Sequence, residues 1–285
     1  MPDTSVPVLS AIRCRAIEDA DLGGVAACLA RNFPERTEAW WLAGLHRLRD
    51  RPAIDGVPRY GVCLDDNGRI GGVLLTIHAP HVKRCNLSSW AIDPDYRQYA
   101  MQVDRAATRG KDVTYLNISP AEHTRKLISA LGYVSLNEDT VLCAPWLSLP
   151  RPGVGVTEWT ADAPMEGYEA QLARDHAAWG WIVLVVTENG RSRPFVFQPK
   201  PLPGISRGAV QALYAPSTDD LARLAGPIGR ALLKRGIWLL KLDGAAVPKG
   251  ITGRAFKGRS ARWAKGPNPP HLNDLSYTEL AIFGA

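Results

Sequence analysis

The sequence has few cysteines, no long apolar run, and no basic or apolar region in its first ten residues. Five cysteines occur in 285 residues and none forms a CxxC pair, so we expect neither a disulfide framework nor a zinc knuckle. The longest apolar stretch covers residues 181–186, whereas a membrane helix needs about 20 residues. Residues 1–10 lack a basic region and an apolar region, so we expect no cleaved signal peptide. These absences predict a cytoplasmic protein that does not enter the membrane.

Several catalytic signatures are also absent from the sequence. It contains no HExxH, Walker A or G-x-S-x-G motif. His78 and His81 lie near each other without a spaced cluster of further ligands, so we expect no metal site. Hydrophobic residues make up 46% and charged residues 22%, which is typical of a folded globular chain rather than a disordered one.

Acidic residues are scarce in the second half of the chain. Residues 1–150 hold 17 basic and 17 acidic side chains, whereas residues 151–285 hold 17 and 11 and carry the whole net charge of +6. This asymmetry is compatible with an anionic ligand in the second half. The alternative is that the positive charge only keeps the surface soluble.

Hydrophobic periodicity predicts an alternation of strands and helices in both halves. A segment rich in proline and glycine, residues 145–155, is the best candidate for a linker and divides the chain into domains 1–148 and 149–285. The predicted strands are 12–16, 60–64, 70–77, 87–92, 113–118, 133–136, 140–143, 154–159, 181–186, 194–197, 209–215, 237–242 and 277–283. The predicted helices are 22–29, 37–49, 96–109, 121–131, 165–176 and 219–235.

The two halves share an internal repeat. Asn67-Gly68-Arg69 and Asn189-Gly190-Arg191 both lie between two predicted strands, where Asn-Gly is the strongest short-range hairpin signal. Residues 91–94 correspond to 213–216, each at the end of a strand before a helix. Gly110 and Gly236 both separate a helix from a strand. The common order of these features predicts a duplicated unit.

This order of elements resembles the GNAT superfamily of acyl-CoA N-acyltransferases. The lead-in Ala91-Ile92-Asp93-Pro94-Asp95-Tyr96-Arg97 resembles the end of the family's fourth strand, which precedes a glycine-rich turn. Such a turn opens a helix whose free N–H groups hold a diphosphate. The resemblance implies an α/β fold of two tandem GNAT-like domains, with mixed central sheets flanked by helices.

The first copy departs from the family motifs. Ala100 and Gln102 stand where the turn has glycines, and Ile128 stands where the family commonly has a tyrosine acid. We therefore expect domain 1–148 to be a degenerate, structural copy. Domain 149–285 is then the expected site of acyl-CoA.

The second copy resembles the turn more closely. Gly229 matches its second small position, and Pro227 with Gly226 beside it stands at the first. The family also uses a backbone N–H of the fourth strand for the acyl carbonyl, which falls at residues 213–214 here. The resemblance implies a cofactor site made of Leu213, Tyr214, Gly226, Ile228, Gly229 and Arg230. The alternative is a single kinked core helix over 219–235, capped by residues 217–220.

The implied reaction moves an acyl group from acetyl-CoA or another acyl-CoA to a small-molecule amine. Such a reaction needs a base and is helped by an acid. Asp243, at the end of the following strand, is the candidate base and Tyr214 the candidate acid. The alternative for both residues is ordinary polarity at the end of a strand. A second function class is a non-catalytic ligand-binding or scaffold protein that keeps only the fold.

Residues 249–265 contain six basic side chains and no acidic one. Three interpretations stay open: a solvated loop, a loop that grips the ribose phosphate of the cofactor, and a nucleic-acid contact. We favour them in that order, so nucleic acid is the least expected partner.

Overall fold

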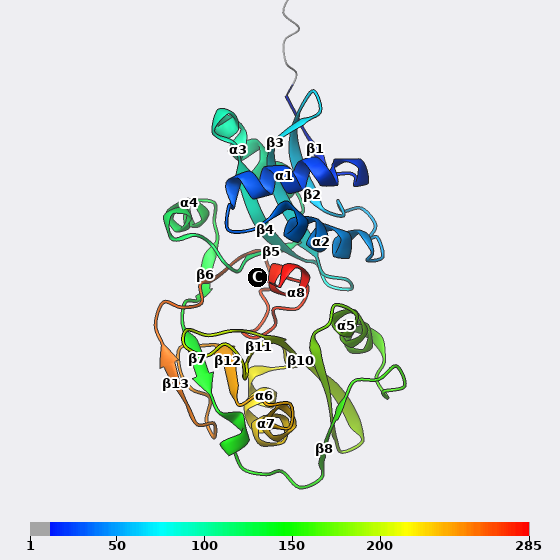
Figure 1. Ribbon diagram of the computed structural model, residues 1–285, viewed down its shortest axis with the longest axis vertical. Helices are drawn as coiled ribbons and strands as arrows, with labels where there is room; N and C mark the ends of the chain where they lie inside the picture. Colours follow the sequence, from blue (N-terminus) through cyan, green and yellow to red (C-terminus); the bar gives the residue numbers. More distant parts are fainter. Residues whose placement is uncertain (1–11, 285) are drawn as a thin grey trace, which may run out of the picture. The chain divides into compact units, whose positions relative to one another are not determined.

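The computed structural model describes residues 12–284 (Figure 1). The expectation about a signal peptide concerns residues 1–10, which lie outside the described part. One compact unit extends to His78 and resumes over Leu87–Lys111, and the other comprises Ala79–Asn86 and the chain from Asp112 onward. No helix within residues 12–284 is long and apolar enough to cross a membrane.

Two mixed sheets of seven strands form the framework of residues 12–284. The first has the order β1-β2-β3-β4-β5-β14-β6 and the second the order β13-β7-β12-β11-β10-β9-β8. The first sheet consists of β1 (Arg13–Ala16), β2 (Gly61–Asp66), β3 (Arg69–His78), β4 (Arg84–Ile92), β5 (Thr114–Asn117), β6 (Val134–Asn137) and β14 (Arg262–Lys265). The second consists of β7 (Thr140–Cys143), β8 (Val154–Glu158), β9 (Ile182–Glu188), β10 (Arg191–Pro199), β11 (Ala209–Tyr214), β12 (Leu239–Asp243) and β13 (Gly253–Phe256). The predicted α/β class with two copies of one unit is confirmed.

Helices flank these sheets. The α-helices are α1 (Leu22–Asn32), α2 (Glu38–Arg49), α3 (Ala100–Ala107), α4 (Arg125–Ala130), α5 (Gly167–Ala178), α6 (Thr218–Arg223), α7 (Ala225–Leu233) and α8 (Glu279–Phe283). The 3-10 turns are η1 (Asp19–Asp21), η2 (Pro94–Tyr99), η3 (Glu122–Thr124) and η4 (Pro145–Leu147). The strand predicted over 277–283 is wrong, because its apolar run forms the short helix α8. The helix predicted over 219–235 is divided at Leu224 into α6 and α7.

Both predicted hairpins are present. Asn67 and Gly68 have φ values of 50° and 92°, and Asn189 and Gly190 have 52° and 76°. Two consecutive positive φ values are the geometry of a type I′ turn, which asparagine and glycine tolerate best. The turns therefore fix the register of β2 with β3 and of β9 with β10.

Each sheet contains one strand from the opposite half of the sequence. Strand β14 lies between β5 and β6 in the first sheet, with Ala264 opposite Leu116 on one side and Val134 on the other. Strand β7 lies between β12 and β13 in the second sheet, where Figure 1 shows it in green among orange strands. The two copies thus exchange their final strands. The division into domains 1–148 and 149–285 stays a prediction, since the sheets do not follow it.

The second sheet is covered by helices on both faces. Leu224, Ile228 and Leu232 of the α6–α7 region join one core cluster with alternate residues of β11 and β12. The residues between them on β11, such as Leu213, join a second cluster with α5 and α8. Alternation of side chains along the strands accounts for these two cores. In the first unit, α1 packs on β3, and α3 packs on β2 and β3.

Candidate functional site

In each sheet, the pairing between two parallel strands stops at an equivalent residue. Three residue pairs join β4 to β5, the last being Asn86 with Leu116. Three pairs also join β11 to β12, the last being Gln211 with Lys241. Asn86 and Gln211 are both 1% exposed. Each copy therefore places a buried carboxamide at the point where its parallel strands separate, and such points are where α/β sheets bind ligands.

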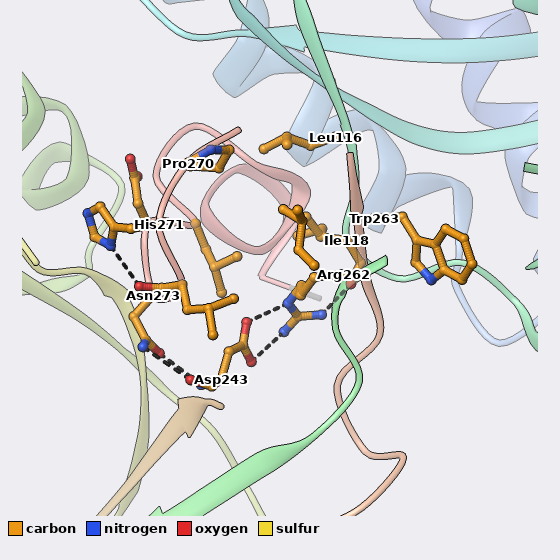
Figure 2. A pocket seen from close by; sticks show the side chains of 12 residues that line it. Leu116, Ile118, Asp243, Arg262, Trp263, Pro270, His271 and Asn273 are labelled. Atoms are coloured by element: carbon orange, nitrogen blue, oxygen red, sulfur yellow. Dashed lines mark hydrogen bonds and ion pairs between the residues drawn. The ribbon is translucent and has the colours of Figure 1, made fainter. Parts of the chain in front are cut away.

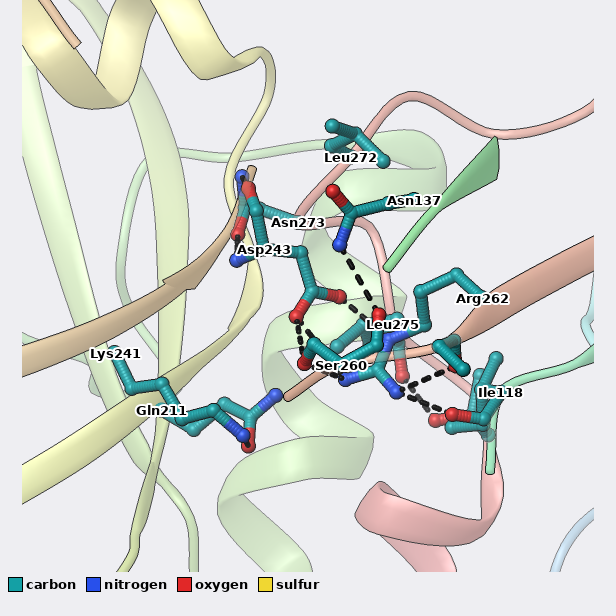
Figure 3. A network of polar contacts seen from close by, with 12 residues as sticks. Ile118, Asn137, Gln211, Lys241, Asp243, Ser260, Arg262, Leu272, Asn273 and Leu275 are labelled. Atoms are coloured by element: carbon teal, nitrogen blue, oxygen red, sulfur yellow. Dashed lines mark hydrogen bonds and ion pairs between the residues drawn. The ribbon is translucent and has the colours of Figure 1, made fainter. Parts of the chain in front are cut away.

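In the second copy, the chain itself spans the separated strand ends. We call residues 273–275 the C-terminal bridge. The N–H of Leu275 donates to the Leu213 carbonyl at 2.7 Å. Asn273 accepts from the Asp243 N–H at 2.8 Å and donates to the Asp243 carbonyl at 3.2 Å (Figure 3). The Leu213 carbonyl of β11 and both backbone groups of Asp243 in β12 are therefore bonded to the bridge.

A buried ion pair anchors the C-terminal bridge. Arg84 donates to both carboxylate oxygens of Asp274, at 2.6 and 3.1 Å, and to the Ser276 hydroxyl at 2.9 Å. Arg84 and Asp274 are 8% and 9% exposed. Separating such a pair leaves an uncompensated buried charge, so this ion pair holds the bridge to β4 of the first sheet, in addition to its bonds with β11 and β12.

The cavity beside the bridge is small. It has a volume of about 20 Å³ and is lined by Asp243, Arg262 and Asn273 among others (Figure 2). Holding one water requires roughly 10–15 Å³. The cavity therefore has room for about one water and not for an acyl chain.

Asp243, the candidate base, is part of a buried network. It is 3% exposed. One carboxylate oxygen accepts from Arg262 Nε at 2.6 Å, and the other accepts from the Ser260 hydroxyl at 2.7 Å and from Arg262 Nη2 at 3.1 Å (Figure 3). Because both oxygens are engaged, proton abstraction would require the network to open. The role of Asp243 as a base stays a prediction.

Tyr214, the candidate acid, faces a different element. Its hydroxyl donates to Glu169 on α5 at 3.5 Å, whereas Asp243 is bonded to β14. Burial, and then the Glu169 carboxylate, raises the pKa of Tyr214 well above its usual value. Burial also raises the pKa of Glu169. The structure does not pair Tyr214 with Asp243, and its role as an acid stays a prediction.

The linker covers the glycines of the predicted diphosphate turn. A Cβ on Gly226 would lie 2.1 Å from the Leu149 carbonyl oxygen, and one on Gly229 would lie 2.2 Å from Trp146 N. Arg230 donates to the Ser148 carbonyl at 3.1 Å. The absence of side chains at these glycines thus lets backbone approach backbone. This packing counts against the prediction that these residues contact a cofactor, and Ile228 is fully buried in the core.

The helix starts also differ from a phosphate turn. The Ser217 hydroxyl accepts from the Asp220 N–H at 2.9 Å, and Asp219 and Asp220 occupy the first turn of α6. Negative side chains there disfavour an anion. In the first copy, η2 runs directly into α3, with the Ala100 N–H bonded to the Arg97 carbonyl. The amide at this motif position is therefore already used within the helix.

Sequence reasoning missed a stretch of polar residues on β4 of the first copy. We call Asn86, Ser88, Ser89 and Trp90 the β4 site. Ser89 has a φ of 57°, a left-handed conformation that is uncommon outside glycine. The Ser88 and Ser89 hydroxyls lie 2.9 Å apart. A strained residue of this kind inside a strand is typical of functional positions.

Buried polar atoms of the β4 site lack partners among the described residues. Both amide atoms of Asn86 and Nε1 of Trp90 are buried without a hydrogen bond there. In the second copy, Lys241 donates to the Gln211 oxygen at 3.4 Å, which leaves only Nε2 of Gln211 without one. Because unpaired buried polar atoms are costly, they indicate a place for a polar ligand or water. Central strands are usually apolar. The polar residues Asn86, Ser88 and Ser89 within β4 were therefore a sequence signal that could have indicated this site.

Comparison with known proteins gives structural matches only. No protein-family model and no curated protein matches the sequence. A putative acetyltransferase from Pyrococcus horikoshii matches with a TM-score of 0.55 and 12% identity over 93% of each chain. A GCN5-related N-acetyltransferase from Anabaena variabilis has a TM-score of 0.58 and 8% identity over 89% of this chain and 72% of its own. A probable N-acyltransferase from Enterococcus faecalis has a TM-score of 0.52 and 10% identity over 93% and 74%.

These matches span nearly all of the chain. Because the sequence identities are so low, the matches support a shared fold and nothing more specific. They agree with the strand order, in which two seven-stranded mixed sheets repeat the same arrangement. They also agree with the motif resemblance at residues 91–97. The chain therefore has the fold of the GNAT acyltransferases, in two tandem copies joined by exchanged strands.

Proposed function

We propose that the protein transfers an acetyl or longer acyl group from acyl-CoA to an amine, and that the acyl donor binds at the β4 site of the first copy. The buried, unpartnered polar atoms of Asn86 and Trp90 carry this proposal. The sequence predicted the second copy instead. We prefer the first because, in the second copy, the C-terminal bridge bonds to the backbone of Leu213 and Asp243 and the linker packs against the glycines of α7.

The polar groups of the β4 site suit the polar parts of an acyl thioester. Asn86 Nδ2 and Trp90 Nε1 are donors, each of which can bind a carbonyl oxygen separately, and Asn86 Oδ1 is an acceptor for an amide N–H. When bound, acyl-CoA supplies an activated thioester carbon. Attack by an amine puts negative charge on the carbonyl oxygen, and fixed donors in a buried site stabilise that charge. The thiol then leaves as the amide bond forms.

A matched pair of variants tests the location. Asn86→Leu replaces an unpaired buried amide by an apolar group of similar size, which is tolerated or stabilising when the amide has no ligand. Gln211→Leu is the same change at the equivalent position of the second copy. We expect the affinity for acetyl-CoA, measured by calorimetry, to fall at least about tenfold in Asn86→Leu. A tenfold fall corresponds to the loss of about 1.4 kcal/mol of binding free energy, as expected for one lost hydrogen bond. We expect the affinity to stay unchanged in Gln211→Leu.

The opposite pattern would move the site. Loss of binding in Gln211→Leu with normal binding in Asn86→Leu would place the acyl donor in the second copy. Circular dichroism of both variants checks that each is folded. Release of free thiol from acetyl-CoA in the presence of a panel of amines then tests catalysis separately from binding.

A second candidate function is non-catalytic ligand binding or scaffolding. It is favoured by the continuous run of η2 into α3, which engages the Ala100 N–H that a diphosphate would need. CoA binding without thiol release across the amine panel would support this candidate, and amine-dependent thiol release would exclude it.

A further inference from the structure

Strand β13 forms an open edge of the second sheet. It pairs with β7 on one side and is the first strand in the sheet order. The Ala144 N–H donates to the Thr252 carbonyl, which lies opposite it in the same register. Because directly opposed residues of an antiparallel pair alternate between bonded and non-bonded, Arg254 and Phe256 bond to β7. The N–H and C=O groups of Gly253 and Ala255 therefore face outward.

Positive charge surrounds this edge. Lys249, Arg254, Lys257 and Arg259 are exposed, and none of the ion pairs within residues 12–284 includes them. The Arg254 guanidinium lies 5.5 Å from the centre of the Phe256 ring, which is 36% exposed.

The nearby acids do not cancel this charge. Asp139 accepts from the Gly258 N–H at 2.9 Å, and Glu138 is exposed beside it. The four exposed cations of residues 249–259 thus outnumber the two carboxylates of residues 138–139. We call β13 with these four cations the basic edge.

We propose that the basic edge binds an extended acidic peptide segment of a partner protein, which adds to the sheet as an eighth strand. Outward backbone groups supply the strand pairing, and the cations select acidic side chains. Two copies of the basic edge would bring like charges together, which disfavours pairing between copies of this chain. A nucleic acid lacks the alternating N–H and C=O groups that Gly253 and Ala255 would pair with.

The dimensions define the peptide. Four residues at about 3.3 Å each give an edge of roughly 13 Å, which four to six residues of a partner strand would cover. Alternate side chains of that strand lie on the same face as Arg254 and Phe256. A segment with acidic residues at every second position therefore fits best. This binding is independent of acyl transfer at the β4 site.

The test uses the full chain and a fluorescein-labelled heptapeptide of alternating Glu and Val, measured by fluorescence anisotropy. We expect saturable binding that weakens with salt, and no binding of the same peptide with Lys in place of Glu. The peptide N-methylated at alternate amides keeps its charge but cannot pair as a strand. We expect its affinity to fall at least tenfold.

Three variants complete the test. Ala255→Pro removes an outward N–H without removing a bond to β7, a position where edge strands tolerate proline. Ala255→Pro and Arg254→Glu should each weaken binding at least tenfold, whereas Lys234→Glu, an exposed cation at the end of α7, should leave it unchanged. The proposal is overturned if the N-methylated peptide binds as well as the parent. It is also overturned if oligothymidylate binds more tightly than the Glu peptide and Ala255→Pro has no effect on either.

Discussion

Substitution of Gly229 by alanine should destabilise the protein. The new Cβ would lie 2.2 Å from Trp146 N and 2.4 Å from the Pro145 carbonyl carbon, whereas non-bonded carbon atoms settle at about 3.5–4 Å. Both neighbours are backbone atoms, so α7 or the linker must shift. Overpacking of this kind costs about 1–3 kcal/mol, and we take the upper value because backbone cannot rotate away.

The intrinsic helix propensity of alanine partly offsets this loss of stability. Alanine is favoured over glycine inside a helix by about 1 kcal/mol, so the net loss expected for Gly229→Ala is about 2 kcal/mol. Gly23→Ala in α1 is the matched control, because no atom lies within 4 Å of its new Cβ. We expect this control to gain about 0.5–1 kcal/mol. Urea unfolding followed by far-UV circular dichroism measures both changes.

One outcome would refute this reasoning. If Gly229→Ala unfolds at the same urea concentration as the parent or higher, while Gly23→Ala is stabilised, the linker does not pack on α7. The glycines would then be open to a diphosphate, as the family resemblance implied.

Three further predictions concern buried groups. Asp274→Ala leaves Arg84 without its buried counter-ion and should lower the free energy of unfolding by about 3–5 kcal/mol, measured by urea unfolding. A urea midpoint equal to that of the parent would contradict this prediction. Burial, and then Arg51, lowers the pKa of His78 to about 4. The unfolded chain takes up this proton near pH 6.5, so stability should fall between about pH 6.5 and 4, and His78→Gln should flatten that dependence in thermal melts. A thiol reagent should label the partly exposed Cys14 before the buried Cys28, Cys63 and Cys143, because burial raises the pKa of these three thiols to about 12. Equal labelling rates would contradict their burial.

Local signals allowed much of the fold to be predicted. The Asn-Gly pairs fixed both hairpins, because few other residues adopt two consecutive positive φ values. Thr37 marks the start of α2, where its hydroxyl accepts from the Trp40 N–H. The repeated order of strands and helices was enough to indicate two copies. These features depend only on residues close together in the sequence.

The strand exchange could not be predicted in this way. Residues 140–143 read as a short apolar strand, but nothing in them specifies β12 and β13 rather than β6 as neighbours. Strands β13 and β14 lie within the segment interpreted as a basic loop. Neither shows an apolar alternation, since β13 is mostly exposed and β14 buries Arg262. Pairing partners distant in sequence are set by the whole core, not by local pattern.

The predicted site residues depend on contacts that the sequence does not specify. Gly226 and Gly229 fit the family turn, yet a glycine that lets a phosphate approach and one that lets a backbone approach look the same in sequence. Asp243 was predicted at a strand end, and it is there, but its partner Arg262 comes from a strand that was not expected. The left-handed Ser89 has no sequence signature at all.

Hydrogen–deuterium exchange of the full chain, with and without CoA, tests the central claim most directly. We predict that CoA slows exchange in peptides covering residues 84–92 and leaves peptides covering residues 209–233 unchanged. Protection confined to residues 209–233 would contradict the assignment of the acyl donor to the first copy.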